Sequence, residues 1–358
     1  MRLLVITNDF PPKPGGIQTY LGSLIDAYPG PVRVLAPADE PATGTRRGEE
    51  IVRRGRRRFM WPTKRVVAWF IEQARDFEAE AVLFGAPHPL SRASARLKAE
   101  LGIPVGVLCH GAEVTIPAAV PGLRGWLRRT LWSADVLFAV SRFTQRKVSR
   151  LTGRDVIAIG AGVEVDTFTP AAGLPENDPP IVGCVSRFVP RKGQHRLIAA
   201  AAKLQQKGQD VEVLIVGKGR NEAKLRRLAT RSGIPVRFEI DVPWPQLPEM
   251  YRSMDVFCMP CRSRWGGLEV EGLGLVFLEA AAAGLPVLAG SSGGSPETVV
   301  PGETGFVVDS VDDIVVGLEI LLSDSVRARQ MGAKGRRRVV DEYVWDRVAA
   351  TLVNGFRS

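Results

Sequence analysis

The chain has 358 residues, of which 45% are hydrophobic and 24% are charged, and its formal net charge is +10 at pH 7. This length suits two domains better than one, and the apolar content is sufficient for two cores. Four dispersed cysteines are too few for a disulfide framework, and the longest apolar stretch, near 275–288, contains Glu279, Gly284 and Pro286, so we expect neither a disulfide scaffold nor a membrane span.

The first half of the chain alternates short apolar runs with turn residues and amphipathic segments. Apolar runs without polar alternation are typical of strands buried on both faces of a parallel sheet. The predicted strands are 3–7, 32–35, 81–84, 105–109, 136–140 and 156–159. Residues 169–180 (TPAAGLPENDPP) are rich in proline and acidic residues, which predicts a linker.

The same alternation restarts after this segment. The predicted strands are 181–186, 211–216, 236–238, 256–260, 286–289 and 305–308, and residues 311–358 predict two or three helices. We therefore predict an α/β protein of two Rossmann-like, doubly wound parallel-sheet domains facing across a cleft. The first comprises residues 1–168 together with a returning C-terminal helix at 344–358, and the second comprises 181–343.

Ligands of such sheets bind beyond the carboxyl ends of the strands, and two loops of the first half are candidates. Gly15 and Gly16 come just before a helix expected from about Ile17, where backbone and free amides can approach an anion, although glycines there can equally serve packing. The loop lacks the G-x-G-x-x-G pattern of a nicotinamide dehydrogenase. His110, in CHGAE after the strand 105–109, is a candidate for the cleft, although a lone histidine can be structural.

Two loops of the second half carry charges suited to a nucleotide diphosphate. Arg187 and Lys192, in SRFVPRKG, would neutralise a diphosphate without a metal, although each could be a solvated surface charge. In EGLGLVFLE, Glu271 precedes a helix expected from Leu275, and Glu279 lies one turn inside it. Their carboxylates can accept hydrogen bonds from sugar hydroxyls. The free amides expected to receive phosphate oxygens are those of Leu275, Val276 and Phe277.

The remaining signals are cysteines and basic clusters. Cys258 and Cys261 form a C-x-x-C that closes an apolar strand, which favours buried thiols over a zinc site. Basic residues concentrate at 46–58, 124–129 and 336–338. They are either solvated surface or a surface for anionic lipid head groups, and the absence of interleaved aromatic residues argues against nucleic acid.

Taken together these loops resemble glycosyltransferase family 4, whose members have the GT-B fold. The resemblance covers essentially the whole chain and rests on the spacing Glu271-x7-Glu279, on Arg187 and Lys192, and on the Gly15-Gly16 loop. The segments NDFPPKPGGIQTY, SRFVPRKGQ, MPCRSRWGGLEVEGLGLVFLEA and GSSGGSPETV look most like the actinobacterial members that transfer mannose from GDP-mannose to a phosphatidylinositol mannoside.

The resemblance implies a role for each site residue. In the donor domain, Arg187 and Lys192 would pair with the diphosphate, Glu279 with the ribose and Glu271 with the mannose hydroxyls. The backbone of Val242 would meet the base, where Glu-Ile-Asp-Val at 239–242 replaces the family's usual aromatic-Thr-Gly-X.

In the acceptor domain, Gly16 would approach the diphosphate, His110 would lie under the sugar, and Asp9 would orient the acceptor hydroxyl. No protein nucleophile is implied, because the leaving phosphate is thought to accept the acceptor's proton.

The sequence thus predicts a retaining, metal-independent α-mannosyltransferase that uses GDP-mannose and a glycolipid acceptor. We expect it in the cytoplasm, peripherally on the inner face of the plasma membrane and not on nucleic acid. Two alternatives stay open: transfer of mannose or glucose from a GDP- or UDP-sugar to another lipid or polysaccharide precursor, and a non-catalytic nucleotide-sugar-binding protein.

Overall fold

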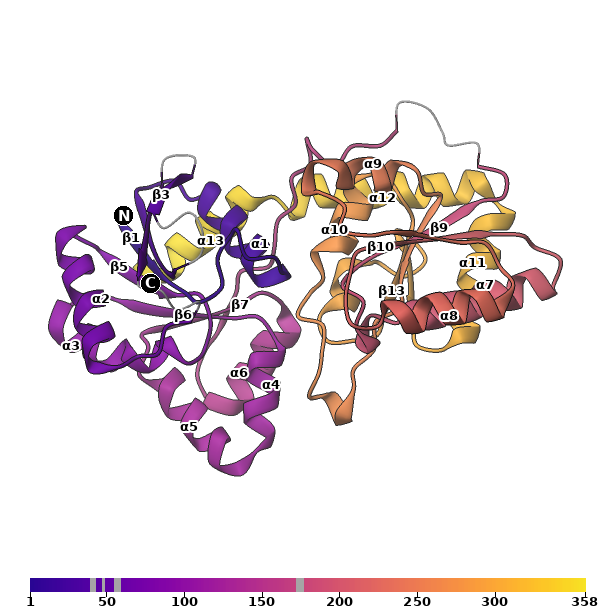
Figure 1. Cartoon of the computed structure of the whole chain (residues 1–358). Coiled ribbons are helices and arrows are strands. Elements are labelled where there is room, and N and C mark those ends of the chain that lie inside the picture. Colours follow the sequence, from indigo (N-terminus) through magenta and orange to yellow (C-terminus); the bar gives the residue numbers. More distant parts are fainter. Residues whose placement is uncertain (39–42, 47–48, 55–58, 172–176) are drawn as a thin grey trace. The chain divides into compact units, whose positions relative to one another are not determined.

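The chain folds into two compact units in the computed structural model, which describes residues 1–38, 43–46, 49–54, 59–171 and 177–358 (Figure 1). Unit 1 contains Met1–Gly162 and Trp345–Ser358, and unit 2 contains Val163–Val344. Unit 1 therefore ends at 162, where the sequence predicted a boundary at 168.

The segment 169–180, predicted as a linker, belongs to unit 2 in its described part, and residues 172–176 lie outside the described residues. The Asn177 amide donates to the Asp255 carboxylate at 2.9 Å, and the backbone amide of Ile181 donates to the same oxygen at 2.7 Å. Because Asp255 directly precedes a strand of unit 2, these bonds tie the end of the segment to the start of that strand.

Unit 1 is built on an eight-stranded sheet of order β3-β4-β2-β1-β5-β6-β7-β8, parallel except for the β3–β4 pair. Its strands are β1 (Leu3–Ile6), β2 (Val32–Pro37), β3 (Thr43–Arg46), β4 (Glu49–Arg54), β5 (Ala81–Phe84), β6 (Val105–Cys109), β7 (Val136–Ala139) and β8 (Ile157–Ala158). Its helices are α1 (Gly16–Asp26), α2 (Lys64–Asp76), α3 (Ser94–Leu101), α4 (Ala112–Ala119), α5 (Pro121–Trp132), α6 (Arg142–Thr152) and α13 (Trp345–Arg357), with a 3-10 turn η1 at Leu90–Ala93.

Helices cover both faces of this sheet. Alternate strand residues such as Leu4, Ile6 and Val107 form one core with the apolar faces of α2, α3, α5 and α6. On the other face the C-terminal helix α13 packs beside α1, and its Phe356 ring lies 5.3 Å from that of Phe138 in β7. Gly106 makes room for it, since a Cβ there would lie 2.6 Å from the Phe356 ring. Helix α13 thereby completes the second helical layer of unit 1.

Unit 2 contains a six-stranded, fully parallel sheet of order β11-β10-β9-β12-β13-β14. Its strands are β9 (Ile181–Val185), β10 (Glu212–Val216), β11 (Val236–Glu239), β12 (Val256–Met259), β13 (Val287–Gly290) and β14 (Gly305–Val308). Its helices are α7 (Gln194–Gln206), α8 (Glu222–Ser232), α9 (Leu247–Arg252), α10 (Leu275–Ala282), α11 (Val311–Ser323) and α12 (Ser325–Glu342), with 3-10 turns η2 (Pro190–Lys192), η3 (Trp244–Gln246), η4 (Trp265–Gly267) and η5 (Ser295–Thr298). Parallel strands share one carboxyl edge, so the loops after β9 to β13 meet there.

The α/β prediction with two parallel sheets is confirmed, and every predicted strand is present within one or two residues of its expected bounds. The antiparallel pair β3–β4 was not predicted. All four cysteines are buried and free, as expected for structural thiols. Over the described ranges, no helix is long and apolar enough to cross a bilayer, and no cluster of three or more histidine, cysteine or acidic side chains could hold a metal ion.

Candidate functional site

The loop from β9 to α7 carries Arg187 and Lys192 at the carboxyl edge of unit 2. Gln194 is buried and donates to the Ser186 hydroxyl at 2.8 Å and to the Arg187 carbonyl at 2.9 Å, which fixes the first half of the loop. At Gly193, with φ of +80°, a Cβ would lie 2.2 Å from the Pro260 carbonyl oxygen, so only glycine fits there. This path buries Lys192 and leaves Arg187 exposed to solvent.

Lys192 and its neighbour Arg191 converge on the carboxylate of Glu271. The Lys192 Nζ lies 2.9 Å from Glu271 Oε2, and the Arg191 guanidinium pairs with the same oxygen. Arg191 also reaches Glu269, at 3.8 Å. Burial by itself would raise the pKa of Glu271, but Lys192 and Arg191 outweigh it and lower the pKa to about 2. Glu271 is therefore an ionised carboxylate inside the protein, held by two cations.

The backbone around Glu271 is fixed by the loop after β13. The Glu271 amide donates to the Ser292 hydroxyl at 3.0 Å, and the Gly294 amide donates to the Glu271 carbonyl at 3.1 Å. Gly293, with φ of +60°, leaves no space for a Cβ, which would lie 1.9 Å from the Glu271 carbonyl oxygen. The backbone at Glu271 is thus held in place by the loop after β13.

Glu279 lies in α10, one turn beyond its start. The hydroxyl of the fully buried Tyr251 donates to Glu279 Oε2 at 2.6 Å. Burial raises the pKa of Glu279 to about 7; the Tyr251 hydrogen bond and the positive charge of Lys192 oppose this, and Glu164 adds to it. Two carboxylates of one loop–helix segment therefore have their pKa values shifted in opposite directions, a pattern typical of functional sites.

The amino end of α10 points its first amides out of the helix. Gly274 precedes it with φ of +96°, and no side chain caps it. The amides of Leu275, Val276 and Phe277 were expected to receive phosphate oxygens. That of Phe277 already donates to the Gly274 carbonyl, at 3.1 Å. Leu275 and Val276 are the first two residues of the helix, where amides have no acceptor within the helix itself.

Val242, expected to meet the base, follows β11 and is partly buried. The residue before it, Asp241, has φ of +56° and pairs with Lys218 at 2.6 Å. Asp241 thus has a left-handed backbone conformation, uncommon for a residue other than glycine, just beyond the end of β11. Val242 therefore lies in a loop of the same sheet edge as Lys192.

In unit 1 the loop after β1 holds Asp9 between polar partners. The Gln18 amide donates to Asp9 Oδ1 at 2.7 Å, and the Lys13 ammonium lies 3.2 Å from the same oxygen. Gly15 has φ of +154°, and a Cβ there would lie 2.2 Å from Gln18 Oε1. At Gly16 a Cβ would meet nothing within 4 Å, so packing does not require glycine there.

His110 lies in the loop after β6, directly before α4. Its Nε2 is 2.9 Å from the Gly85 carbonyl oxygen, which can only accept, so the proton is on Nε2 and Nδ1 remains for another partner. Its ring meets that of Tyr20 edge-on at 5.3 Å. A Cβ on Gly85 would lie 2.9 Å from the hydroxyl of Thr7, which in turn accepts from the Asp9 amide, so the His110 and Asp9 loops are neighbours in unit 1.

Two sequence profiles match this chain along its length. The profile described as "Glycosyltransferase Family 4" matches residues 14–167, and that described as "Glycosyl transferases group 1" matches residues 166–338. The chain is 38% identical to the "GDP-mannose-dependent monoacylated alpha-(1-6)-phosphatidylinositol monomannoside mannosyltransferase" of Corynebacterium glutamicum, over 100% of this chain and 98% of that protein. The chain belongs to glycosyltransferase family 4.

A second relative is similar over its full length, and a solved structure shares the fold. The chain is 38% identical to the "GDP-mannose-dependent alpha-(1-6)-phosphatidylinositol monomannoside mannosyltransferase" of Mycolicibacterium smegmatis, over 98% of this chain and 97% of that protein. The crystal structure of Anabaena HepE in complex with UDP matches with a TM-score of 0.82 at 18% identity, covering 100% of both chains. The GT-B fold predicted from the family 4 resemblance is confirmed.

Two residues of the site were not predicted: Arg191, the second cation on Glu271, and Glu269, which pairs with Arg191. A signal was present, since Arg191 is adjacent to Lys192 and Glu269 is two residues before Glu271. In an extended segment residues two apart lie on one face, so two adjacent cations can meet two alternate carboxylates.

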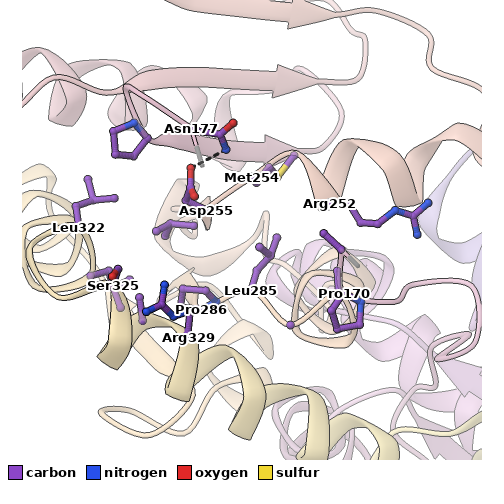
Figure 2. A pocket seen from close by; sticks show the side chains of 17 residues that line it. Pro170, Asn177, Arg252, Met254, Asp255, Leu285, Pro286, Leu322, Ser325 and Arg329 are labelled. Carbon is purple, nitrogen blue, oxygen red and sulfur yellow. Dashed lines mark hydrogen bonds between the residues drawn. The ribbon is translucent and has the colours of Figure 1, made fainter. Parts of the chain in front are cut away.

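A cavity of about 290 Å³ opens at the opposite edge of the unit 2 sheet, where the strands begin (Figure 2). Asp255 and Pro286, which precede β12 and β13, line it together with apolar side chains such as Leu285 and Leu322. Its carboxylate, Asp255, is already bound by Asn177, as the dashed line in Figure 2 marks. The candidate site of this family 4 chain is therefore not this cavity but the carboxyl edge.

Gly16 and Gly15 offer a matched pair of substitutions. Gly16→Ala should leave the free energy of unfolding unchanged or raise it by about 0.5–1 kcal/mol, since alanine is the better helix residue. If the donor approaches this backbone, the same substitution should weaken GDP-mannose binding at least about tenfold. Gly15→Ala should instead lower the unfolding temperature, because a residue with a Cβ is strained at φ of +154° and would also displace the Gln18 amide. Thermal unfolding and a donor titration check both, and unchanged donor affinity in Gly16→Ala would contradict the role of this loop.

Proposed function

We propose that this chain transfers an α-mannosyl group, with retention of configuration, from GDP-mannose to a phosphatidylinositol mannoside. The observation that carries the proposal is the ionised Glu271 held by Lys192 and Arg191 at the carboxyl edge of unit 2, in a chain whose full-length relatives are named for this reaction. A carboxylate that can accept from sugar hydroxyls, next to a lysine that can pair with phosphate, suits a nucleotide-sugar donor.

Unit 2 would hold the donor by its charged end. Lys192 and Arg187 pair with the diphosphate, and the amides of Leu275 and Val276 add donors at a helix start. Glu279 accepts from the ribose hydroxyls, and the backbone of Val242 meets the base. Negative charge develops on GDP as it leaves, and its attraction to these positive groups increases. They therefore stabilise the transition state more than the bound donor.

Lys192, Arg191 and Arg187 would together neutralise the negative charge of the diphosphate, which a divalent metal does in other nucleotide-sugar enzymes. Lys192 and Arg191 both lie within contact of Glu271, and Arg187 lies five residues from Lys192 in the same loop. We therefore propose that transfer proceeds without a metal ion.

Unit 1 would supply the acceptor side. Gly16 lets the diphosphate approach the start of α1, and His110 lies under the mannose with Nε2 held by Gly85. Asp9 orients the acceptor hydroxyl. Because the leaving phosphate accepts the proton of that hydroxyl, Asp9 need not act as the base, which agrees with its carboxylate being engaged by Gln18 and Lys13.

Because the proposed acceptor is a lipid, we place the enzyme peripherally at the cytoplasmic face of the plasma membrane. GDP-mannose is a soluble donor, and the acceptor head group lies at the bilayer surface.

Calorimetric titration with GDP, UDP and ADP in the presence of EDTA tests the donor site. We expect tightest binding for GDP, and a loss on Arg187→Ala of about tenfold or more, the effect of removing one charge-assisted phosphate contact. Arg231→Ala, an exposed arginine of α8, should bind GDP normally. Tighter binding of UDP, or dependence on added metal, would overturn the donor assignment, and failure to mannosylate phosphatidylinositol mannoside would overturn the acceptor.

A further inference from the structure

One strongly basic part of unit 1 lies wholly within the described residues. Residues 112–154 carry eight basic and two acidic residues, a net charge of +6 out of +10 for the whole chain. They form α4, α5, β7 and α6, and the three helices pack against one another, as Figure 1 shows. The basic residues are Arg124, Arg128, Arg129, Arg142, Arg146, Lys147, Arg150 and Arg154.

The two acidic residues of this segment are engaged. Glu113 accepts from the Gly111 amide at 2.7 Å and from the His110 amide, and Asp135 accepts from the Val105 amide and pairs with Lys98. Arg124, Arg128, Arg129, Arg146 and Arg150, by contrast, form no ion pair with any described residue, and all five are exposed. Positive charge on these helices is therefore not neutralised by the fold around it.

Exposed apolar side chains lie among these arginines. Helices α4 and α5 meet directly at Val120. Ile116 is 44% exposed, and Val120 and Leu123 are each 47% exposed. They form an apolar corner beside Arg124. Large side chains left in water next to unpaired cations are typical of surfaces that enter the head-group region of an anionic bilayer.

The basic cluster at 336–338 does not offer such a surface. Arg336 donates to the carbonyls of Phe168 and Ala282, and Arg338 donates to the Glu297 carbonyl, so both support the fold of unit 2. The cluster at 46–58 lies partly outside the described residues.

We infer that the α4–α5–α6 surface docks unit 1 on an anionic membrane, with Ile116, Val120 and Leu123 entering the head-group layer and the arginines pairing with lipid phosphates. Helix α4 begins two residues after His110, so this contact would bring the His110 loop to the bilayer surface from which a lipid acceptor is taken. The inference relies on the proposed function only for that acceptor; membrane binding itself is independent of turnover.

Vesicle flotation of the full-length protein, without donor, tests the charges. We expect binding to phosphatidylcholine vesicles that contain phosphatidylinositol, weak binding to phosphatidylcholine alone, and release by salt. Arg124→Glu/Arg128→Glu should lower the partition coefficient by about fivefold or more for each residue, since a basic residue near an anionic surface contributes about 1 kcal/mol. The control Lys334→Glu/Arg337→Glu makes the same charge change on exposed residues of α12 and should bind like the parent.

A second pair of variants tests the apolar corner. Ile116→Ser/Leu123→Ser should weaken vesicle binding, including at high salt, whereas Val316→Ser/Val326→Ser, comparably exposed residues of unit 2, should not. GDP affinity and the circular dichroism spectrum should be unchanged in all four variants, which shows that each is folded.

The outcomes separate the two proposals. If the α12 control loses as much vesicle binding as the α5 variant, binding follows net charge alone and the docking surface is overturned. It is also overturned if both α4–α5 variants bind vesicles like the parent. Vesicle binding that behaves as expected in a protein unable to mannosylate phosphatidylinositol mannoside would instead overturn the proposed acceptor and leave the surface standing.

Discussion

Lys192→Met is expected to lower the rate of mannosyl transfer by about a hundredfold to a thousandfold, the range seen when one preorganised group that stabilises developing negative charge is removed. The lysine is buried and lies 2.9 Å from Glu271. Methionine keeps the aliphatic stem and removes the charge, so the site loses a phosphate partner while keeping most of its packing. Stopped assays of product formation at saturating GDP-mannose, with GDP affinity by calorimetry, measure the effect.

The matched control is Lys203→Met, which removes an exposed lysine of α7 whose partner is the surface carboxylate of Asp312. It should change neither transfer nor GDP affinity. Lys192→Met should also lower the unfolding temperature, because the buried Glu271 loses one of its two cations. If Lys192→Met unfolds at a lower temperature yet transfers mannose at the parental rate, the lysine supports the fold alone.

The strands could be predicted closely because a strand covered by helices on both faces has few positions for a polar residue. In β6, for example, all five residues Val105–Cys109 are buried. The pair β3–β4 escaped prediction because its residues, TGTR and EEIVRR, lack that continuous apolar run. Of the two strands, β3 forms the edge of the sheet and pairs antiparallel with β4.

The sequence allowed the site residues to be located, but not the contacts between them. Loops after buried strands located Lys192 and Glu271, which the fold then brings to 2.9 Å although they are 79 residues apart. The Lys192–Glu271 pair and the second contact from Arg191 cannot be predicted from local sequence. Both depend on β9 and β12 being neighbours in the sheet. The Tyr251–Glu279 bond is non-local in the same way.

The prolines of 169–180 led to the prediction of a linker, but composition reports only the absence of regular structure. Asn177 and the Ile181 amide bind Asp255, so the end of this segment is ordered by hydrogen bonds that a composition count does not register.

Glu279→Gln is expected to make the protein more stable at neutral pH and less able to bind GDP. The folded-state pKa of Glu279 is about 7, above the 4.5 of an unperturbed glutamate. Between these values the folded protein keeps a proton that the unfolded chain has released. The stability contributed by this protonated carboxyl is therefore complete below about pH 4.5 and is lost as the pH rises through about 7.

Glutamine is neutral at every pH and can still accept from Tyr251, so it avoids this loss. The free energy of unfolding of Glu279→Gln, measured with urea, should equal that of the parent near pH 4.5 and exceed it by up to about 3 kcal/mol at pH 8. Glu319→Gln, at a surface carboxylate of α11 paired with Lys207, should show no such pH-dependent gain.

Binding should change in the opposite direction, because the carboxylate that destabilises the fold is the group that accepts from the ribose. Ionised Glu279 is the stronger acceptor, so the GDP affinity of the parent relative to Glu279→Gln should grow as the pH rises from 6 to 8, and this ratio cancels the titration of GDP itself. At pH 8 we expect the variant to bind about tenfold more weakly. A stability gain without any loss of GDP affinity would show that Glu279 does not contact the donor, whereas loss of both would point to disruption of the Tyr251 bond. A more stable protein with a weaker donor site is the combination expected if burying this carboxylate serves ligand binding at the cost of stability.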